Sequence, residues 1–151
     1  MEIQAAILHY CKYQERCQSE VRSKLYELGA TTIEVEQQIS LLIENGVVNE
    51  ERFARAFAGG KFRMKQWGRV KVKQQLKQRN ISDYCIKKAM TEIDVEDYET
   101  TLKKLALKKL AEVRSEKSVA LKKHKIYKYL IQKGYESSKV IEMINDFLEI
   151  S

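Results

Sequence analysis

The chain has 151 residues, with 28 Lys and Arg against 21 Asp and Glu, no proline and a net charge of +7. Hydrophobic residues make up 44%, as in folded proteins, and the mixed signs of the charged residues argue against a disordered tail. No apolar run approaches the roughly 20 residues that cross a bilayer, and Glu2, His9 and Lys12 lie where a signal peptide would be apolar. We therefore expect a cytoplasmic protein with no membrane contact.

The few cysteines and histidines argue against several kinds of chemistry. Cys11, Cys17 and Cys85 are odd in number and lack the spacing of a metal site or a redox pair, so free thiols in a reducing cytosol are the simplest interpretation. Only His9 and His124 could supply imidazole, and they are far apart in the sequence. We expect no metal site, no cofactor and no catalytic residue, because a small enzyme would need Cys, His and carboxylate groups that this spacing does not cluster.

A glycine-rich phosphate loop is also missing. Gly59-Gly60-Lys61 lacks the rest of the P-loop pattern and lies in a helical register without a preceding strand. The glycine pair is interpreted as a local helix break or a close contact between helices.

Apolar residues recur at intervals of three and four from the start of the chain, at Ile3, Ile7, Tyr10, then Val21, Leu25, Leu28, then Val35, Ile39 and Leu42. This spacing predicts three amphipathic helices in the first 48 residues. Gly29 can end the second helix in the left-handed conformation, and Thr31 with Glu34 forms a capping box for the third. Gly46 ends the third helix, and Asn49 begins a fourth.

The same pattern returns twice. The segments 25–29, 76–80 and 130–134 each begin with Leu and end with Gly, Asn and Gly respectively, the residues that best tolerate a left-handed helix cap. Apolar positions after each cap also coincide, at Val35, Ile39, Leu42, at Ile86, Met90, Ile93 and at Val140, Ile144, Phe147. We predict an all-α fold of three tandem three-helix repeats, helix-turn-helix-like units, over residues 1–48, 49–94 and 95–151.

A repeat of about 50 residues is near the lower limit for burying a core of its own, so neighbouring repeats should pack together. An elongated, curved body with a long exposed face is the expected result. One compact nine-helix bundle is the alternative, because periodicity does not distinguish the two packings.

Charge is concentrated in the second repeat, which carries +7 against −3 for the first and +3 for the third. Between Arg52 and Ser82, here called the basic segment, there are ten Lys and Arg and no Asp or Glu. A helix opening near Gly68 would align Arg69, Lys73 and Lys77 along one side. The residues expected to contact an anionic partner are Arg63, Lys65, Arg69, Lys71, Lys73, Lys77 and Arg79.

That partner could be a nucleic-acid phosphate backbone or an acidic groove on a protein. A solvated helical face is the alternative interpretation. Trp67, inside the basic segment, is either a stacking side chain or a core residue that closes the turn between two helices, and the second is favoured. Tyr127, Tyr129 and Tyr135 alternate with lysines, as in some nucleic-acid surfaces, but the helical spacing of Ile126 and Leu130 favours a structural role.

These residues resemble the RecX family of bacterial recombinase regulators. The central likeness runs from Asn49-Glu-Glu-Arg-Phe-Ala-Arg-Ala-Phe57 through Trp67-Gly68-Arg69 to the helix ending in Leu76. The first repeat agrees through Tyr13-Gln-Glu-Arg16 and Lys24-Leu-Tyr-Glu-Leu-Gly29, and the third more loosely through Lys125-Ile-Tyr-Lys-Tyr-Leu130. The chain departs from the family pattern at Asn49-Glu50-Glu51, at the cap residue Asn80 and at Cys17, where a basic residue is usual.

The resemblance implies a monomeric cytoplasmic regulator that binds the RecA–DNA filament. It implies mainly inhibition of RecA ATPase, strand-exchange and co-protease activity in recombination, DNA repair and the SOS response. The resemblance also implies contact with single-stranded or double-stranded DNA, directly or within the filament. A helical-repeat protein that binds nucleic acid without a recombinase partner is the alternative.

Overall fold

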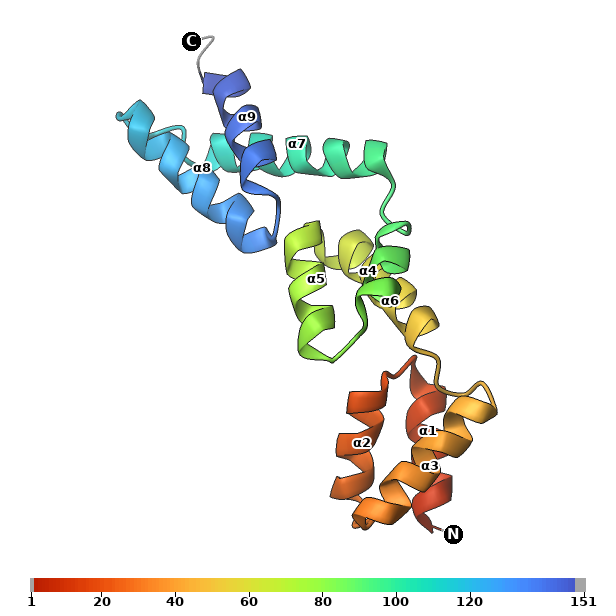
Figure 1. The fold of residues 1–151 in the computed structure, drawn as a ribbon. Coiled ribbons are helices and arrows are strands. Elements are labelled where there is room, and N and C mark those ends of the chain that lie inside the picture. Colours follow the sequence, from red (N-terminus) through yellow and green to blue (C-terminus); the bar gives the residue numbers. More distant parts are fainter. Residues whose placement is uncertain (1, 149–151) are drawn as a thin grey trace. The chain divides into compact units, whose positions relative to one another are not determined.

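The computed structural model describes residues 2–148, which contain nine α-helices and no strand. The helices are α1 (Glu2–Tyr13), α2 (Gln18–Glu27), α3 (Thr32–Glu44), α4 (Glu50–Lys65), α5 (Arg69–Gln78), α6 (Asp83–Met90), α7 (Val95–Glu112), α8 (Val119–Lys133) and α9 (Ser137–Leu148) (Figure 1). The all-helical prediction is confirmed. Within the described residues, no helix has the length and apolar character needed to span a bilayer.

Helix boundaries follow the predicted capping chemistry. The three predicted cap residues Gly29, Asn80 and Gly134 have φ of 93°, 60° and 100°, in the left-handed region. Thr31 Oγ1 accepts a hydrogen bond from the Glu34 amide at 3.3 Å, and the Glu34 carboxylate accepts one from the Thr31 amide at 2.9 Å. Local sequence therefore decides where these helices begin and end.

The described residues form two compact units. The N-terminal unit comprises residues 2–58 and 75–92, and the C-terminal unit comprises residues 59–74 and 93–148. Helices α4 and α5 each contribute residues to both units. The division into three repeats at residues 48 and 94 stays a prediction.

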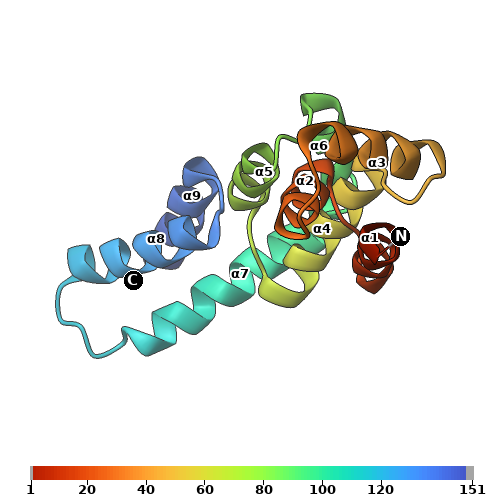
Figure 2. The same ribbon diagram turned by 90° about the horizontal axis from the view of Figure 1, so that it is seen from below.

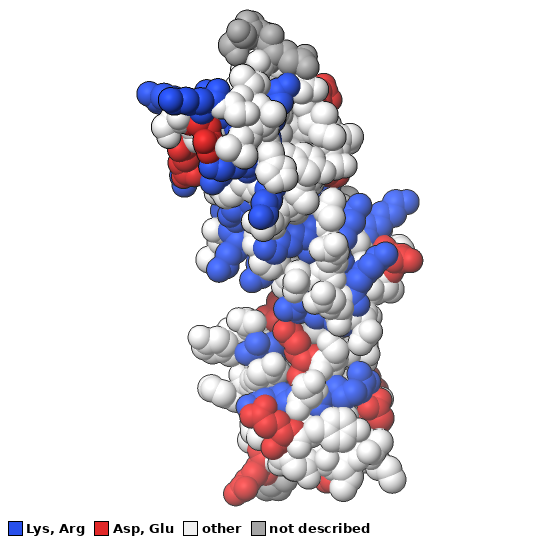
Figure 3. All heavy atoms as spheres, turned by 90° about the vertical axis from the view of Figure 1, so that its left-hand side faces the viewer, with Lys and Arg blue, Asp and Glu red and all other residues white. Residues whose placement is uncertain are grey.

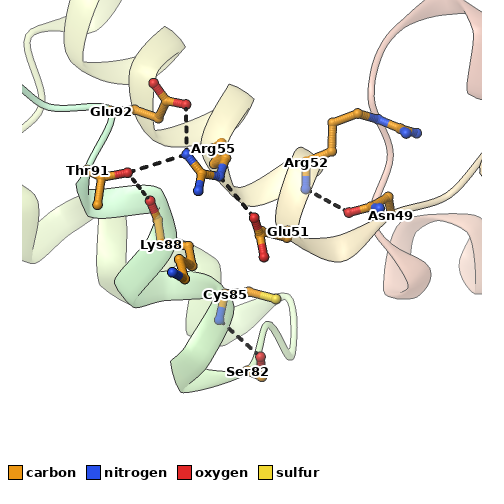
Figure 4. Close-up of polar contacts among 9 residues, drawn as sticks. All are labelled: Asn49, Glu51, Arg52, Arg55, Ser82, Cys85, Lys88, Thr91 and Glu92. Carbon is orange, nitrogen blue, oxygen red and sulfur yellow. Dashed lines mark hydrogen bonds and ion pairs between the residues drawn. The ribbon is translucent and has the colours of Figure 1, made fainter.

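In the N-terminal unit, helices α1 to α3 share a buried core whose members are Ile7, Val21, Leu25, Ala30, Val35, Ile39, Leu42 and Val48. Arg55 of α4 contacts Glu51 on the same helix at 3.2 Å and Glu92, just after the end of α6, at 3.5 Å (Figure 4). Asn49 Oδ1 caps α4 by accepting the Arg52 amide at 2.9 Å, as the sequence predicts.

In the C-terminal unit, α8 and α9 lie side by side and pack with α7 (Figures 1 and 2). Three aromatic rings from separate segments meet in its core. The Tyr98 ring centroid lies 5.9 Å from that of Phe62 and 5.0 Å from that of Tyr135. Tyr98 and Tyr135 are among the largest fully buried side chains of the described residues. Through these rings, the end of α4 packs against α7 and the turn after α8.

Two turns of the C-terminal unit are joined through their backbones. The Gly68 amide donates to the Lys133 carbonyl at 2.8 Å, and the Val70 amide donates to the Gly134 carbonyl at 2.9 Å. The last carbonyls of α8 therefore satisfy amides at the start of α5 that have no partner within their own helix. A Cβ atom at Gly68 would lie 2.3 Å from the Gly134 carbonyl, so only glycine allows this approach. We call this contact the turn–turn junction.

Side chains complete the turn–turn junction. The buried Tyr98 hydroxyl accepts the Arg69 amide at 3.0 Å and donates to the Glu136 carboxylate at 2.5 Å. Arg69 in turn forms an ion pair with Glu136 at 3.0 Å. Burial, together with the hydrogen bond to Glu136, raises the pKa of Tyr98, so the phenol stays protonated as a donor. Burial alone would raise the pKa of Glu136, but the Tyr98 and Arg69 hydrogen bonds outweigh it and hold that pKa below its usual value.

Replacing Tyr98 with Phe should destabilise the C-terminal unit, since the Arg69 amide and the Glu136 carboxylate both lose a buried partner. We expect the free energy of unfolding to fall by about 1–3 kcal/mol. Urea denaturation followed by the fluorescence of Trp67, the one tryptophan of the chain, measures this change. Tyr84→Phe is the control because Tyr84 is exposed; equal stability of the two variants would contradict the assignment.

Acid should weaken the turn–turn junction through Glu136. A carboxyl group whose pKa is lowered by folding stabilises the protein above its unfolded-state pKa, about 4.3. This stabilisation disappears as the pH falls through the folded-state pKa. The stability difference between the native chain and Glu136→Gln, on the order of 1 kcal/mol at neutral pH, should therefore shrink on acidification. A difference independent of pH would show that the Glu136 charge contributes nothing.

Candidate anion-binding surface

The predicted contact residues occupy α4, α5 and the residue after α5. Arg63, Lys65, Arg69, Lys71 and Lys73 belong to the C-terminal unit, whereas Lys77 and Arg79 belong to the N-terminal unit. Figure 3 shows basic side chains gathered over α4 and α5, whereas those of α1 to α3 alternate with acidic ones. The charge asymmetry of the sequence is therefore also present on the surface.

Most arginines of the basic segment are engaged within the protein. Besides Arg55 and Arg69, Arg52 pairs with Glu15 at 2.7 Å and also donates to the carbonyls of Gly46 and Val47 at 3.0 Å. Arg79 donates to the Gln75 carbonyl at 3.0 Å, and its guanidinium lies 3.9 Å from Glu20. The planar guanidinium suits this use, because it binds several acceptors in one orientation. Two predicted contact residues, Arg69 and Arg79, thus also hold the fold together.

The remaining predicted residues point into solvent. Arg63, Lys65, Lys73 and Lys77 are exposed, and none of them pairs with a carboxylate among residues 2–148. Lys73 and Lys77 lie one turn apart on α5, so their charges reinforce each other. Arg63 lies against Gly59, where an added Cβ would meet its guanidinium at 2.8 Å. Helix α4 continues through the glycine pair without a break, and the Arg63 guanidinium occupies the space beside Gly59.

Trp67 is half-buried and has lysines beside its ring. Lys61 Nζ lies 5.0 Å and Lys71 Nζ 4.6 Å from the ring centroid. The preceding residue, Gln66, has a φ of 58°, and its carbonyl accepts a hydrogen bond from the Tyr135 hydroxyl at 2.9 Å. No sequence signal predicts a left-handed residue here, because glutamine rarely adopts the conformation.

The tyrosines of α8 and of the turn that follows it differ in burial. Tyr135 is buried and pairs with the backbone, as the structural interpretation predicts, whereas Tyr127 and Tyr129 are half-buried. All three cysteines are free. Within the described residues, no group of His, Cys, Asp and Glu could hold a metal ion.

Known proteins are similar to this chain in both sequence and fold. A family model described as "RecX, second three-helix domain" matches residues 49–90. A crystal structure of RecX from Lactobacillus salivarius is 25% identical, with a TM-score of 0.82 over 99% of this chain and 96% of that one. A second crystal structure, of a regulatory protein RecX, is 28% identical, with a TM-score of 0.84 over 96% of this chain and 70% of that one.

Proteins named Regulatory protein RecX are similar along most of the chain. The relative from Lactococcus lactis subsp. cremoris (strain SK11) is 32% identical over 145 residues, which are 95% of this chain and 54% of the relative. The relative from Clostridium perfringens (strain 13) is 30% identical over 122 residues, 80% of this chain and 57% of the relative. The chain thus spans little more than half the length of these two relatives. Sequence and fold agree that the chain belongs to the RecX family.

Proposed function

We propose that this protein binds the RecA–DNA filament and restrains RecA, lowering ATP hydrolysis, strand exchange and co-protease activity. Membership in the RecX family supports the regulatory role. The observation that carries the contact is the set of exposed cations on α4 and α5 that no carboxylate of the described residues neutralises. A filament of recombinase on DNA offers phosphates and acidic side chains to such a surface, and opposite charge steers the encounter.

The contact is assigned to Arg63, Lys65, Lys73 and Lys77, with Lys71 beside Trp67. Arg69 and Arg79 remain part of the proposed surface, although their guanidinium groups also serve the fold. Their substitution would disturb the protein's own structure, so a test of binding has to leave them in place.

Single-strand-dependent ATP hydrolysis by the RecA of the same organism, titrated with this protein, tests the proposal. We expect inhibition at amounts well below one molecule per RecA protomer, because one regulator bound to a filament affects many protomers. Binding to bare DNA across a salt series is the companion measurement. Tight, steeply salt-dependent binding to bare DNA without inhibition would reject the proposal in favour of a nucleic-acid-binding protein with no recombinase partner.

Reversing two charges on α5 should weaken filament binding. In Lys73→Glu/Lys77→Glu, repulsion replaces attraction, and we expect about a ten-fold loss of inhibition, equivalent to roughly 1.4 kcal/mol. Helicity by circular dichroism should be unchanged, since both side chains are exposed. Lys12→Glu/Lys87→Glu makes the same change of charge at exposed lysines on α1 and α6 and serves as the control. Equal inhibition by both variants would reject the α5 assignment.

A further inference from the structure

Arg16, in the turn after α1, is held by two contacts with Tyr10 of that helix. Its guanidinium carbon lies 3.8 Å from the Tyr10 ring centroid, and its Nε donates a hydrogen bond to the Tyr10 carbonyl at 3.1 Å. That carbonyl lies in the last turn of α1, where backbone acceptors have no partner within the helix. The ring contact and the hydrogen bond together fix the plane and the direction of the guanidinium group.

The two terminal nitrogens of the Arg16 guanidinium have no partner among the described residues. No carboxylate of these residues forms an ion pair with Arg16, and its one hydrogen bond is made by Nε. The neighbouring carboxylates bind other groups: Glu15 pairs with Arg52 at 2.7 Å, and Glu20 accepts a hydrogen bond from the Cys17 amide at 3.1 Å. Arg16 therefore presents two oriented donors that the described part of the chain does not use.

An open pocket of about 510 Å³ lies beside Arg16 in the N-terminal unit, and we call it the Arg16 pocket. Tyr13, at its edge, is 78% exposed, and its ring centroid lies 5.9 Å from the Arg16 guanidinium carbon. Small and apolar side chains of α1 and of the end of α2 supply much of the remaining wall. The lining includes Ala5, Ala6, His9, Tyr13, Arg16 and Leu28. The pocket thus places an oriented guanidinium beside apolar and aromatic surface.

The charge around the Arg16 pocket disfavours a partner with many negative charges. The first 48 residues carry four basic and seven acidic side chains, a net charge of −3. Lys24, which also lines the pocket, is paired with Glu27 at 3.5 Å. A nucleic acid brings a phosphate at every step of its backbone, and these carboxylates would repel it. A single acidic side chain meets Arg16 without that repulsion, so the pocket favours a protein as its partner.

The residue types of the Arg16 pocket agree with a protein partner. Arginine and tyrosine are enriched among the residues that contribute most to binding in protein–protein interfaces. The arginine fork binds both oxygens of a carboxylate at once. Because Tyr10 already fixes the Arg16 guanidinium, binding there loses less side-chain entropy than binding to a freely rotating arginine.

We propose that the Arg16 pocket binds a segment of a protein partner that presents an acidic side chain next to an apolar one. The carboxylate accepts hydrogen bonds from the terminal nitrogens of Arg16, and the apolar side chain packs against Tyr13, Ala6 and Leu28. The inference goes beyond the proposed function, which assigns its contact to α4 and α5, and its test requires neither RecA nor DNA.

An NMR titration of the full chain with an acetylated and amidated Leu-Glu-Phe peptide tests the pocket. At millimolar peptide we expect saturable shifts of the Arg16 Nε–H signal and of the Tyr13 amide. The matched Leu-Gln-Phe peptide keeps the apolar groups but lacks the charge, and its dissociation constant should be at least about ten-fold higher. Because this comparison changes the peptide and not the protein, folding cannot affect it. Equal affinity of the two peptides would overturn the inference, as would the absence of shifts at Arg16.

Variants of Arg16 give a second measurement with the Leu-Glu-Phe peptide. Arg16→Gln should lose at least about ten-fold in affinity, and Arg16→Lys, which keeps the charge without the fork, should recover only part of it. Arg114→Gln removes the same charge from an exposed position of the C-terminal unit and should bind like the native chain. Equal losses in Arg16→Gln and Arg114→Gln would overturn the assignment to the pocket. A larger shift of the Arg16 signal with oligothymidylate than with the peptide would overturn the choice of a protein partner.

Discussion

The turn–turn junction is the contact on which the C-terminal unit depends. The amides of Gly68 and Val70, at the start of α5, have no hydrogen-bond acceptor within their own helix. They donate instead to the carbonyls of Lys133 and Gly134 at the end of α8, which also lack a partner within their helix. Glycine at 68 makes the approach possible, and Tyr98 closes it from the side of α7. Because hydrogen bonds, close packing and an ion pair meet there, residues 59–74 belong with α7 to α9 and not with the helices nearest to them in sequence.

The basic segment combines ion pairs within the protein with an exposed positive charge. Four of its five arginines pair with a carboxylate of their own unit, where a charge-assisted fork holds one segment to another. Its exposed lysines carry the charge that the proposed function assigns to contact with a partner. The amides that open α5 are occupied by α8 and Tyr98, so that helix start is not available as an anion site of the usual kind. The proposed anion contact is therefore assigned to side chains.

Local chemistry made much of the fold predictable, whereas the site depends on contacts between distant segments. Helix spacing and the caps at Gly29, Asn80 and Gly134 are decided within a few residues, and all were predicted correctly. The pairing of Arg69 with Glu136 joins residues 67 positions apart, and no spacing rule indicates it. The sequence around Tyr98 carries no signal of its buried hydrogen bonds, and Gln66 lacks the glycine that usually marks a left-handed turn. The favoured interpretation of Trp67 as a residue that closes a turn describes its position but omits the lysines beside it.

The central claim is that the α4–α5 turn folds as part of the C-terminal unit. Amide hydrogen exchange resolved to single residues tests it most directly, at the Gly68 and Val70 amides that bond to α8. The account predicts that both exchange with the same opening free energy as core amides of α7 and α8, such as those of Leu105 and Leu130. Rapid exchange of both, or exchange together with the core of the N-terminal unit around Leu25, would contradict it.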